Sequence, residues 1–147
     1  MKVLDNMIGI ERARRLITEI YEKTEIRLIE KKSAFNLFAI PIRDLKARKD
    51  SFSSFKEFTK AQFNAGIQEK FHESETIEDT ENALAVDVKY CVVHEVATEF
   101  GNAAWAFPWC EIDEVVYPRM GAQLGFKYTR SSSLPTGASK CDFRFER

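Results

Sequence analysis

The sequence predicts an α+β fold in which an antiparallel sheet of about four strands, arranged as two hairpins, packs against helices. Two observations support this prediction: apolar residues follow helical spacing in the first half, and they alternate with polar residues in short stretches of the second half. The length of 147 residues suits one domain spanning 1–147. Residues 1–72 should be mainly helical, and 73–147 should run hairpin, helix, helix, hairpin.

The first half predicts two helices. A long N-terminal helix should run from Leu4 to about Leu28, because apolar residues recur at helical spacing while Glu, Arg and Lys fill the other face. Pro41 should break the chain after it. A second helix should begin at Asp50 or Ser51, since either residue suits an N-cap. Its apolar side would consist of Phe52, Phe55, Phe63 and Ile67.

A strand is expected over Leu84–Tyr90, where apolar and polar residues alternate. Residues 73–79 would form its hairpin partner across a turn at 80–82. A short helix over Val92–Phe100 should then stop at Gly101, because glycine commonly ends helices.

A further helix is expected from Trp109 to Met120, ending near Gly121. The chain then predicts a second hairpin, because residues 126–129 and 141–146 again alternate. The polar loop 131–139, which contains proline and glycine, would join these two strands. Twelve phenylalanines indicate an aromatic-rich core.

Composition excludes some classes of function. The formal net charge is −1 and basic residues form no stripe, so no nucleic-acid partner is expected. No apolar run approaches the ~20 residues that span a bilayer, and the N-terminus lacks a signal-peptide pattern. We therefore expect a cytoplasmic protein that binds a small molecule, and a homo-oligomer is compatible with the sequence. Three cysteines, an odd number, favour free thiols, ligands or nucleophiles over disulfides.

Cys91 is the first candidate for chemistry, because it ends a predicted strand where a helix begins. A thiol at a helix N-terminus meets partial positive charge, which favours the thiolate. His94 follows three residues later on roughly the same helical face. The alternative is a small buried cysteine and a surface histidine.

Cys110 follows Pro108 in a predicted helix, with Asp113 and Glu114 three and four residues further on. Both carboxylates can therefore share its face. A carboxylate there could orient a base or a water, or complete a metal site. It would also raise the thiol pKa, which counts against a solitary activated nucleophile. An acidic helix surface is the alternative reading.

Cys141 begins the last strand on its apolar side, as a core cysteine would. The sequence contains no CxxC, HExxH, GxSxG, GxGxxG or Walker motif. No cofactor is expected, although zinc is conceivable. A zinc site would need Cys91, Cys110 and Cys141 together with a further ligand such as His94.

From Tyr90 to Arg147, the order of short elements and motifs is similar to that of a known protein family. A strand ends at Cys91, a helix follows, and then come Cys110-Glu-Ile-Asp113 and Pro118. The most specific piece is the closing Gly137-Ala-Ser-Lys-Cys141-Asp142-Phe143-Arg144-Phe145. This region resembles the L-2-amino-thiazoline-4-carboxylic acid hydrolase family, and the N-terminal half matches only in being helical.

The resemblance implies a hydrolase that opens a small carboxylated cyclic amidine, such as 2-amino-thiazoline-4-carboxylate, and yields an N-carbamoyl amino acid with a free thiol. Such a reaction needs a nucleophile, a proton donor and a cation for the substrate carboxylate. On this reading Cys110 attacks directly or Asp113 activates water, and His94 moves a proton. Cys91 is a second candidate thiol.

The substrate carboxylate would be held by Arg119, Arg130 or Arg144, because a guanidinium binds carboxylates bidentately. Trp109, in the aromatic segment from Trp105, either lines this site or packs in the core.

A different class of function is also open. The second half is similar to small-molecule sensor domains of the vinyl-reductase type, in which cysteines hold a structural zinc and the ligand is not turned over. In a third reading all three thiols belong to the core, and the aromatic segment lines a pocket or a dimer contact.

Overall fold

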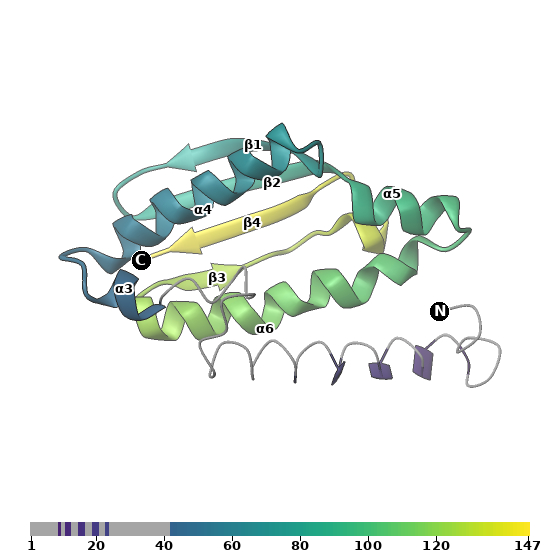
Figure 1. Ribbon diagram of the computed structural model, residues 1–147, viewed down its shortest axis with the longest axis horizontal. Helices are drawn as coiled ribbons and strands as arrows, with labels where there is room; N and C mark the ends of the chain where they lie inside the picture. The colour runs from purple at the N-terminus through teal and green to yellow at the C-terminus, as the bar shows by residue number, and fades with distance from the viewer. Residues whose placement is uncertain (1–8, 10, 13–14, 17–18, 21–22, 24–41) are drawn as a thin grey trace.

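The computed structural model describes residues 42–147 and positions 9, 11, 12, 15, 16, 19, 20 and 23 (Figure 1). The expected N-terminal helix lies almost entirely outside the described residues, and so does Pro41. The side chains of Trp105 and Phe107 are likewise outside the description.

The described chain forms the predicted four-stranded antiparallel sheet. Its strands are β1 (His72–Asp79), β2 (Ala83–Cys91), β3 (Lys127–Thr129) and β4 (Cys141–Glu146). They lie in the order β1-β2-β4-β3, so the two hairpins meet where β2 pairs with β4. This arrangement confirms the α+β prediction and places the last strand inside the sheet.

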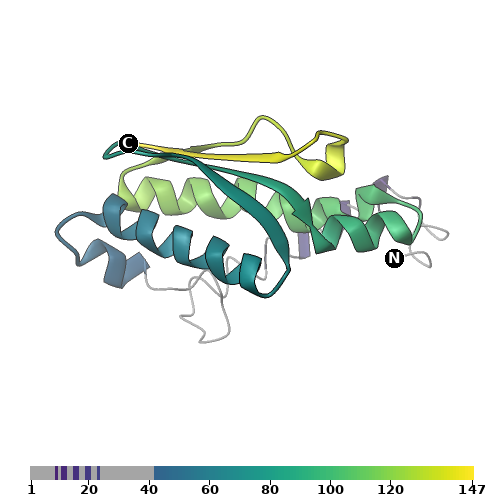
Figure 2. The ribbon, with the colours of Figure 1, turned by 90° about the horizontal axis from the view of Figure 1, so that it is seen from above.

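Helices occupy one side of this sheet. They are α3 (Ile42–Lys46), α4 (Ser51–Gln68), α5 (Val92–Glu99) and α6 (Phe107–Leu124), with short 3₁₀ turns η1 (Ala103–Ala106) and η2 (Leu134–Thr136). Figure 2 shows α4 and α6 on the same face of the sheet, with α5 beyond its end. Among the described residues no helix combines the length and hydrophobicity that crossing a lipid bilayer requires.

The start of α4 agrees with the sequence prediction. The Asp50 side chain accepts a hydrogen bond from the backbone N–H of Ser53 at 3.0 Å, as an N-cap does. Phe52 and Phe55 are buried, whereas Ile67 is exposed near the helix end, so the predicted apolar side is shorter than expected.

The core lies between the helices and one face of the sheet. Its central contact is the stack of Phe55 on Phe126, with ring centroids 4.2 Å apart. Alternate residues of β2 and β4 and one stripe of α6 complete it: Leu84, Val86, Val88, Cys141, Phe143, Phe145, Ile112, Val116, Met120 and Leu124. Five phenylalanines belong to this core, namely Phe52, Phe55, Phe126, Phe143 and Phe145, whereas Phe71 and Phe100 are exposed.

The end of α6 differs from the prediction. The helix runs through Gly121 to Leu124 and stops at Gly125, whose φ of +78° is the left-handed conformation that glycine adopts readily. Gly121 serves packing instead, because a Cβ there would collide with the carbonyl oxygen of Phe126.

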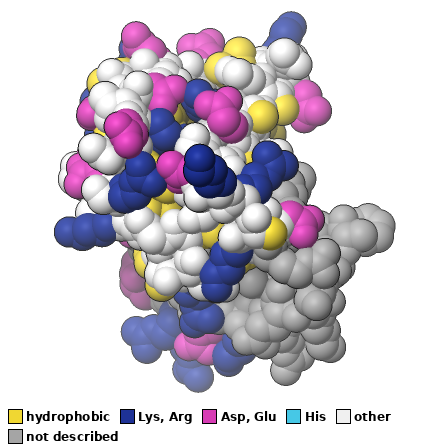
Figure 3. Space-filling model, turned by 90° about the vertical axis from the view of Figure 1, so that its left-hand side faces the viewer, with side chains coloured by type: hydrophobic (Ala, Val, Ile, Leu, Met, Phe, Trp, Pro, Cys, Tyr) yellow, Lys and Arg dark blue, Asp and Glu magenta, His cyan; other side chains and the backbone are white. Residues whose placement is uncertain are grey.

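The other face of the sheet carries buried polar contacts. Asp87 on β2 is only 3% exposed, although the alternation predicts a polar outward position for it. The side chains of Lys140 and Arg144 cover it and form ion pairs with its carboxylate. At the end of the molecule that holds the C-terminus, basic and acidic side chains are interspersed over the described surface (Figure 3).

Candidate functional site

One face of α6 brings three polar side chains toward the sheet. Cys110, Asp113 and Tyr117 lie at positions i, i+3 and i+7, which share a face of an α-helix. Pro108 stands at the first turn of α6, where its missing N–H leaves no helical bond unmade. The sequence prediction that Asp113 shares the face of Cys110 therefore holds.

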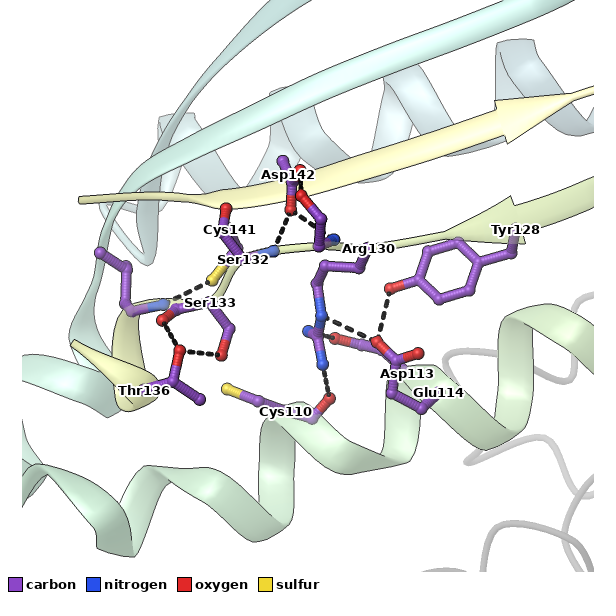
Figure 4. Close-up of polar contacts among 12 residues, drawn as sticks. Cys110, Asp113, Glu114, Tyr128, Arg130, Ser132, Ser133, Thr136, Cys141 and Asp142 are labelled. Carbon is purple, nitrogen blue, oxygen red and sulfur yellow. Dashed lines mark hydrogen bonds and ion pairs between the residues drawn. The ribbon is translucent and has the colours of Figure 1, made fainter. Parts of the chain in front are cut away.

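Arg130 reaches this face from the sheet. It follows β3 and continues the alternation of Phe126 and Tyr128, so its side chain points to the helix side. Its guanidinium bonds to Asp113 at 3.1 Å, to Glu114 at 2.9 Å and to the carbonyl oxygen of Cys110 at 2.7 Å (Figure 4).

The Arg130 side chain is 7% exposed and also lies over the Phe143 ring, at 5.5 Å from its centroid. In the part of the chain that the structure describes, its polar contacts use three of the five guanidinium N–H donors. The remaining two belong to the terminal nitrogens, beside Asp113 and Cys110.

Glu114 and Tyr128 complete the group. From the sequence, Glu114 was placed on the face of Cys110 but assigned no role of its own, and Tyr128 was not singled out. The Tyr128 hydroxyl donates to Glu114 Oε1 at 3.3 Å, and Glu114 is 46% exposed where Asp113 is 17% exposed. The spacing from Cys110 placed Glu114 on the correct face, but only the fold shows that it shares Arg130 with Asp113.

The electrostatics of Asp113 are unusual for an aspartate. Burial raises its pKa to about 7, and the Glu114 carboxylate adds to the rise while Arg130 opposes it. Near neutral pH this carboxyl is therefore present both with and without its proton. Perturbed carboxyl groups of this kind are typical of functional sites.

Cys110 differs from an activated nucleophile. Burial raises the pKa of its thiol to about 12, and Asp113 and Cys141 add to the rise. The thiol is thus protonated at neutral pH. In Figure 4 its sulfur points toward the loop that carries Ser133 and Thr136.

The closing motif shapes that loop. Gly137 has a φ of +86° and ends η2, and the buried Cys141 sulfur accepts a hydrogen bond from the Leu134 N–H at 3.3 Å. Asp142 accepts hydrogen bonds from residues 131 and 132, while Phe143 packs in the core. In this structure Gly137, Cys141 and Asp142 stabilise the loop before β4, and Phe143 contributes to the hydrophobic core.

Among the described residues, Cys91 and His94 form no hydrogen bond with this group, although Cys91 is close enough to Cys110 and Cys141 to help raise the pKa of both thiols. Cys91 is the N-cap residue of α5, as predicted, and packs partly buried against the core. Partly buried His94 lies one turn into α5. Within the described chain, neither side chain joins the hydrogen bonds around Arg130.

The other predicted substrate-binding residues are also elsewhere. Arg144 lies on the opposite face of the sheet, where it binds Asp87 at 2.8 Å. Arg119 is nine residues after Cys110 and so roughly 180° around α6 from it. Trp109 is 54% exposed next to Cys110 along the helix. Of the three arginines, the fold brings only Arg130 to Asp113.

Among the described residues, the cysteines that were named as possible zinc ligands do not form a metal-binding group. Cys91, Cys110 and Cys141 are all free thiols. Over the described residues, no three His, Cys, Asp or Glu side chains form a group that could hold a metal ion.

No curated protein matches the chain. The family model described as L-2-amino-thiazoline-4-carboxylic acid hydrolase matches residues 2–145. This match extends well beyond the C-terminal region in which the motifs lie, and it includes every residue of the Arg130 group. The chain therefore belongs to the L-2-amino-thiazoline-4-carboxylic acid hydrolase family.

Proposed function

We propose that this protein is a hydrolase that opens a small carboxylated cyclic amidine, such as 2-amino-thiazoline-4-carboxylate, to an N-carbamoyl amino acid with a free thiol. Family membership supports the reaction class. The observation that carries the proposal is the Asp113 carboxyl, which is held by Arg130 and has a pKa of about 7.

Asp113 acts first as a base and then as an acid. Its carboxylate takes a proton from water while the water oxygen bonds to the amidine carbon. The electron pair of the carbon–nitrogen double bond moves to the ring nitrogen, which takes a proton from solvent. When the tetrahedral intermediate collapses, its hydroxyl loses its proton to solvent and becomes the carbamoyl oxygen, the bond from this carbon to the ring sulfur breaks, and Asp113 returns its proton to the sulfur. One water is thus added, its two protons are accounted for by the ring nitrogen and the sulfur, and no electrons are exchanged. A pKa near the working pH suits a group that must do both.

Water is assigned as the nucleophile because the pKa of Cys110 is about 12, which leaves little thiolate at neutral pH. Cys110 then forms part of the wall beside the reacting carbon.

Arg130 supplies the cation for the substrate carboxylate. Its two terminal nitrogens each carry one N–H that is not used by the contacts with Asp113 and Cys110. A carboxylate bound there would sit next to Asp113, and a bidentate contact would orient the ring.

The test measures release of the product thiol from 2-amino-thiazoline-4-carboxylate by the purified chain. We expect Asp113→Asn to lower kcat by about 100-fold or more, as loss of a general base does. Cys110→Ala should keep kcat within about tenfold of wild type, since no bond to sulfur forms. Loss of turnover in Cys110→Ala with activity kept in Asp113→Asn would instead assign the thiol as nucleophile. Binding without thiol release by wild type would favour a ligand-binding protein of the sensor class.

A further inference from the structure

Asp142 points to the opposite face of the sheet from Asp113, yet it is bonded to the two residues that follow Arg130. Its Oδ1 accepts from the N–H of Ser131 at 2.9 Å and from the N–H of Ser132 at 2.6 Å. Its Oδ2 accepts from the Ser131 hydroxyl at 2.6 Å. The backbone N–H of Asp142 also donates to the carbonyl of Ser132 at 3.3 Å.

These bonds are of the stronger, charge-assisted kind. Burial opposes ionisation of Asp142, but the hydrogen bonds from Ser131 and Ser132 outweigh it and lower its pKa to about 2. Asp142 is therefore ionised at neutral pH, and bonds to an ionised acceptor are roughly twice as strong as neutral ones. Since Asp142 is only 8% exposed, water competes little for them.

Arg130 has no regular strand partner of its own, because β3 ends at Thr129. Its backbone is held on one side by β3 and on the other by the bonds of Asp142 to residues 131 and 132. We infer that Asp142 is a positioning residue: by holding the Ser131–Ser132 backbone, it fixes the Arg130 guanidinium against Asp113.

The titration of Asp113 can report on this role. The groups that surround its carboxyl come from α6, from the end of β3 and from β4, and they are Cys110, Glu114, Tyr117, Tyr128, Arg130 and Cys141. Arg130 is the one cation in this described set, and it opposes the rise in the pKa of Asp113. If Arg130 is released, the titration midpoint of Asp113 should therefore move upward.

The experiment follows the carboxyl ¹³C resonance of Asp113 by NMR as a function of pH. In Asp142→Ala the midpoint should rise by about one unit or more, the size of effect that a neighbouring cation has. In Asp142→Asn the midpoint should rise less than in Asp142→Ala, because the amide oxygen can still accept both backbone N–H bonds, although without the charge that strengthens them. Such partial rescue would not follow if the side chain mattered only through its charge.

Asp87→Ala is the matched control. Asp87 pairs directly with Asp142 across β2 and β4, and it too is buried, but its carboxylate forms ion pairs with Lys140 and Arg144 instead of bonds to residues 131 and 132. This variant should leave the Asp113 midpoint unchanged. An equal rise in Asp87→Ala, or no rise in folded Asp142→Ala, would overturn the inference.

If Asp142→Ala does not fold, the Asp113 midpoint in Ser131→Ala tests the positioning role instead. It removes only the 2.6 Å hydroxyl bond at an exposed residue. A smaller rise of the Asp113 midpoint supports the positioning role, and an unchanged midpoint rejects it.

The inference rests on the proposed function only in treating Asp113 as the working carboxyl. The NMR readout needs no substrate, so the two can fail separately. A midpoint that rises in a protein without thiol-releasing activity would keep the positioning role and reject the hydrolase. If wild type releases thiol but the Asp113 midpoint does not rise in Asp142→Ala, the hydrolase proposal stands and the positioning role is rejected.

Discussion

The Asp113 carboxyl is controlled by two neighbours of opposite sign. Arg130 favours its ionised form, whereas Glu114 disfavours it, and burial of Asp113 exceeds both. One guanidinium thus serves two carboxylates, and the more exposed of the two, Glu114, takes the Nε edge. The pKa of Asp113 should therefore depend on Glu114, although no hydrogen bond between these two side chains is described.

Glu114→Gln tests this dependence. Removing the second negative charge should lower the Asp113 midpoint by about one unit, because a like charge nearby disfavours ionisation. Carboxyl ¹³C NMR measures it directly. Glu99→Gln makes the same charge change at an exposed residue of α5 and should have no effect. A midpoint that rises in Glu114→Gln would mean that Glu114 mainly holds Arg130 in place.

The site was only partly predictable from single residues. The Cys-x-x-Asp spacing fixes Asp113 on the face of Cys110 wherever α6 packs, so it could be predicted. Local alternation places Arg130 on the helix face after Phe126 and Tyr128, and places Arg144 on the opposite face between Phe143 and Phe145. The sequence does not show that Arg130 lies beside Asp113, or which backbone Asp142 binds, because these contacts join residues that are distant along the chain.

At the scale of elements, the close approach of α6 to β3 depends on one glycine. Gly121 accepts hydrogen bonds at its carbonyl from the N–H groups of Gly125 and Phe126, and its Cα faces the Phe126 carbonyl. The turn between helix and strand is therefore as tight as the backbone permits. This turn sets where β3, and hence Arg130, lies along α6.

Gly121→Ala should destabilise the fold by about 1–3 kcal/mol, the usual cost of forcing extra atoms into a packed site. Alanine is the better helix former, so helix propensity alone predicts the opposite sign. Urea denaturation measures the difference, with Ala122→Ser at an exposed position of the same turn as the control. A variant as stable as wild type would show that the turn can widen freely.

Helices and strands were well predicted where each has one buried face and one exposed face. Both hairpins and α5 follow the predicted ranges within a few residues, because alternation and glycine stops are local signals. The end of α6 was misplaced because Gly121 was interpreted as a stop. Gly125 ends the helix, and the role of Gly121 becomes visible only with Phe126 beside it.

For the whole molecule, the sheet separates carboxyl groups with opposite pH behaviour. On the helix face, burial raises the pKa of Asp113 to about 7. On the other face, hydrogen bonds overcome burial and lower the pKa of Asp142 to about 2, and Lys140 and Arg144 likewise lower that of Asp87. An unfolded aspartate titrates near 3.9, so folding shifts the two kinds of group in opposite directions.

The two shifts predict stability changes of opposite sign. Asp113 binds its proton more tightly when folded, so its contribution to the free energy of unfolding is full below about pH 4 and is lost as pH rises through about 7. Asp142 holds its proton less tightly when folded, so its contribution is full above about pH 4 and is lost as pH falls toward about 2. The two windows meet near pH 4 and hardly overlap.

Urea denaturation of wild type, Asp113→Asn and Asp142→Asn from pH 3 to pH 9 can separate these contributions, because asparagine does not titrate. Relative to Asp113→Asn, wild type should lose stability from about pH 4 to pH 7 and then stay level. Relative to Asp142→Asn, it should lose stability only as the pH falls below about 4. Two difference curves that slope the same way would mean that Asp113 is ionised in the folded protein well below neutral pH. In that case Arg130, rather than burial, governs Asp113, and its carboxylate would be too weak a base to take the proton from water efficiently in the proposed reaction.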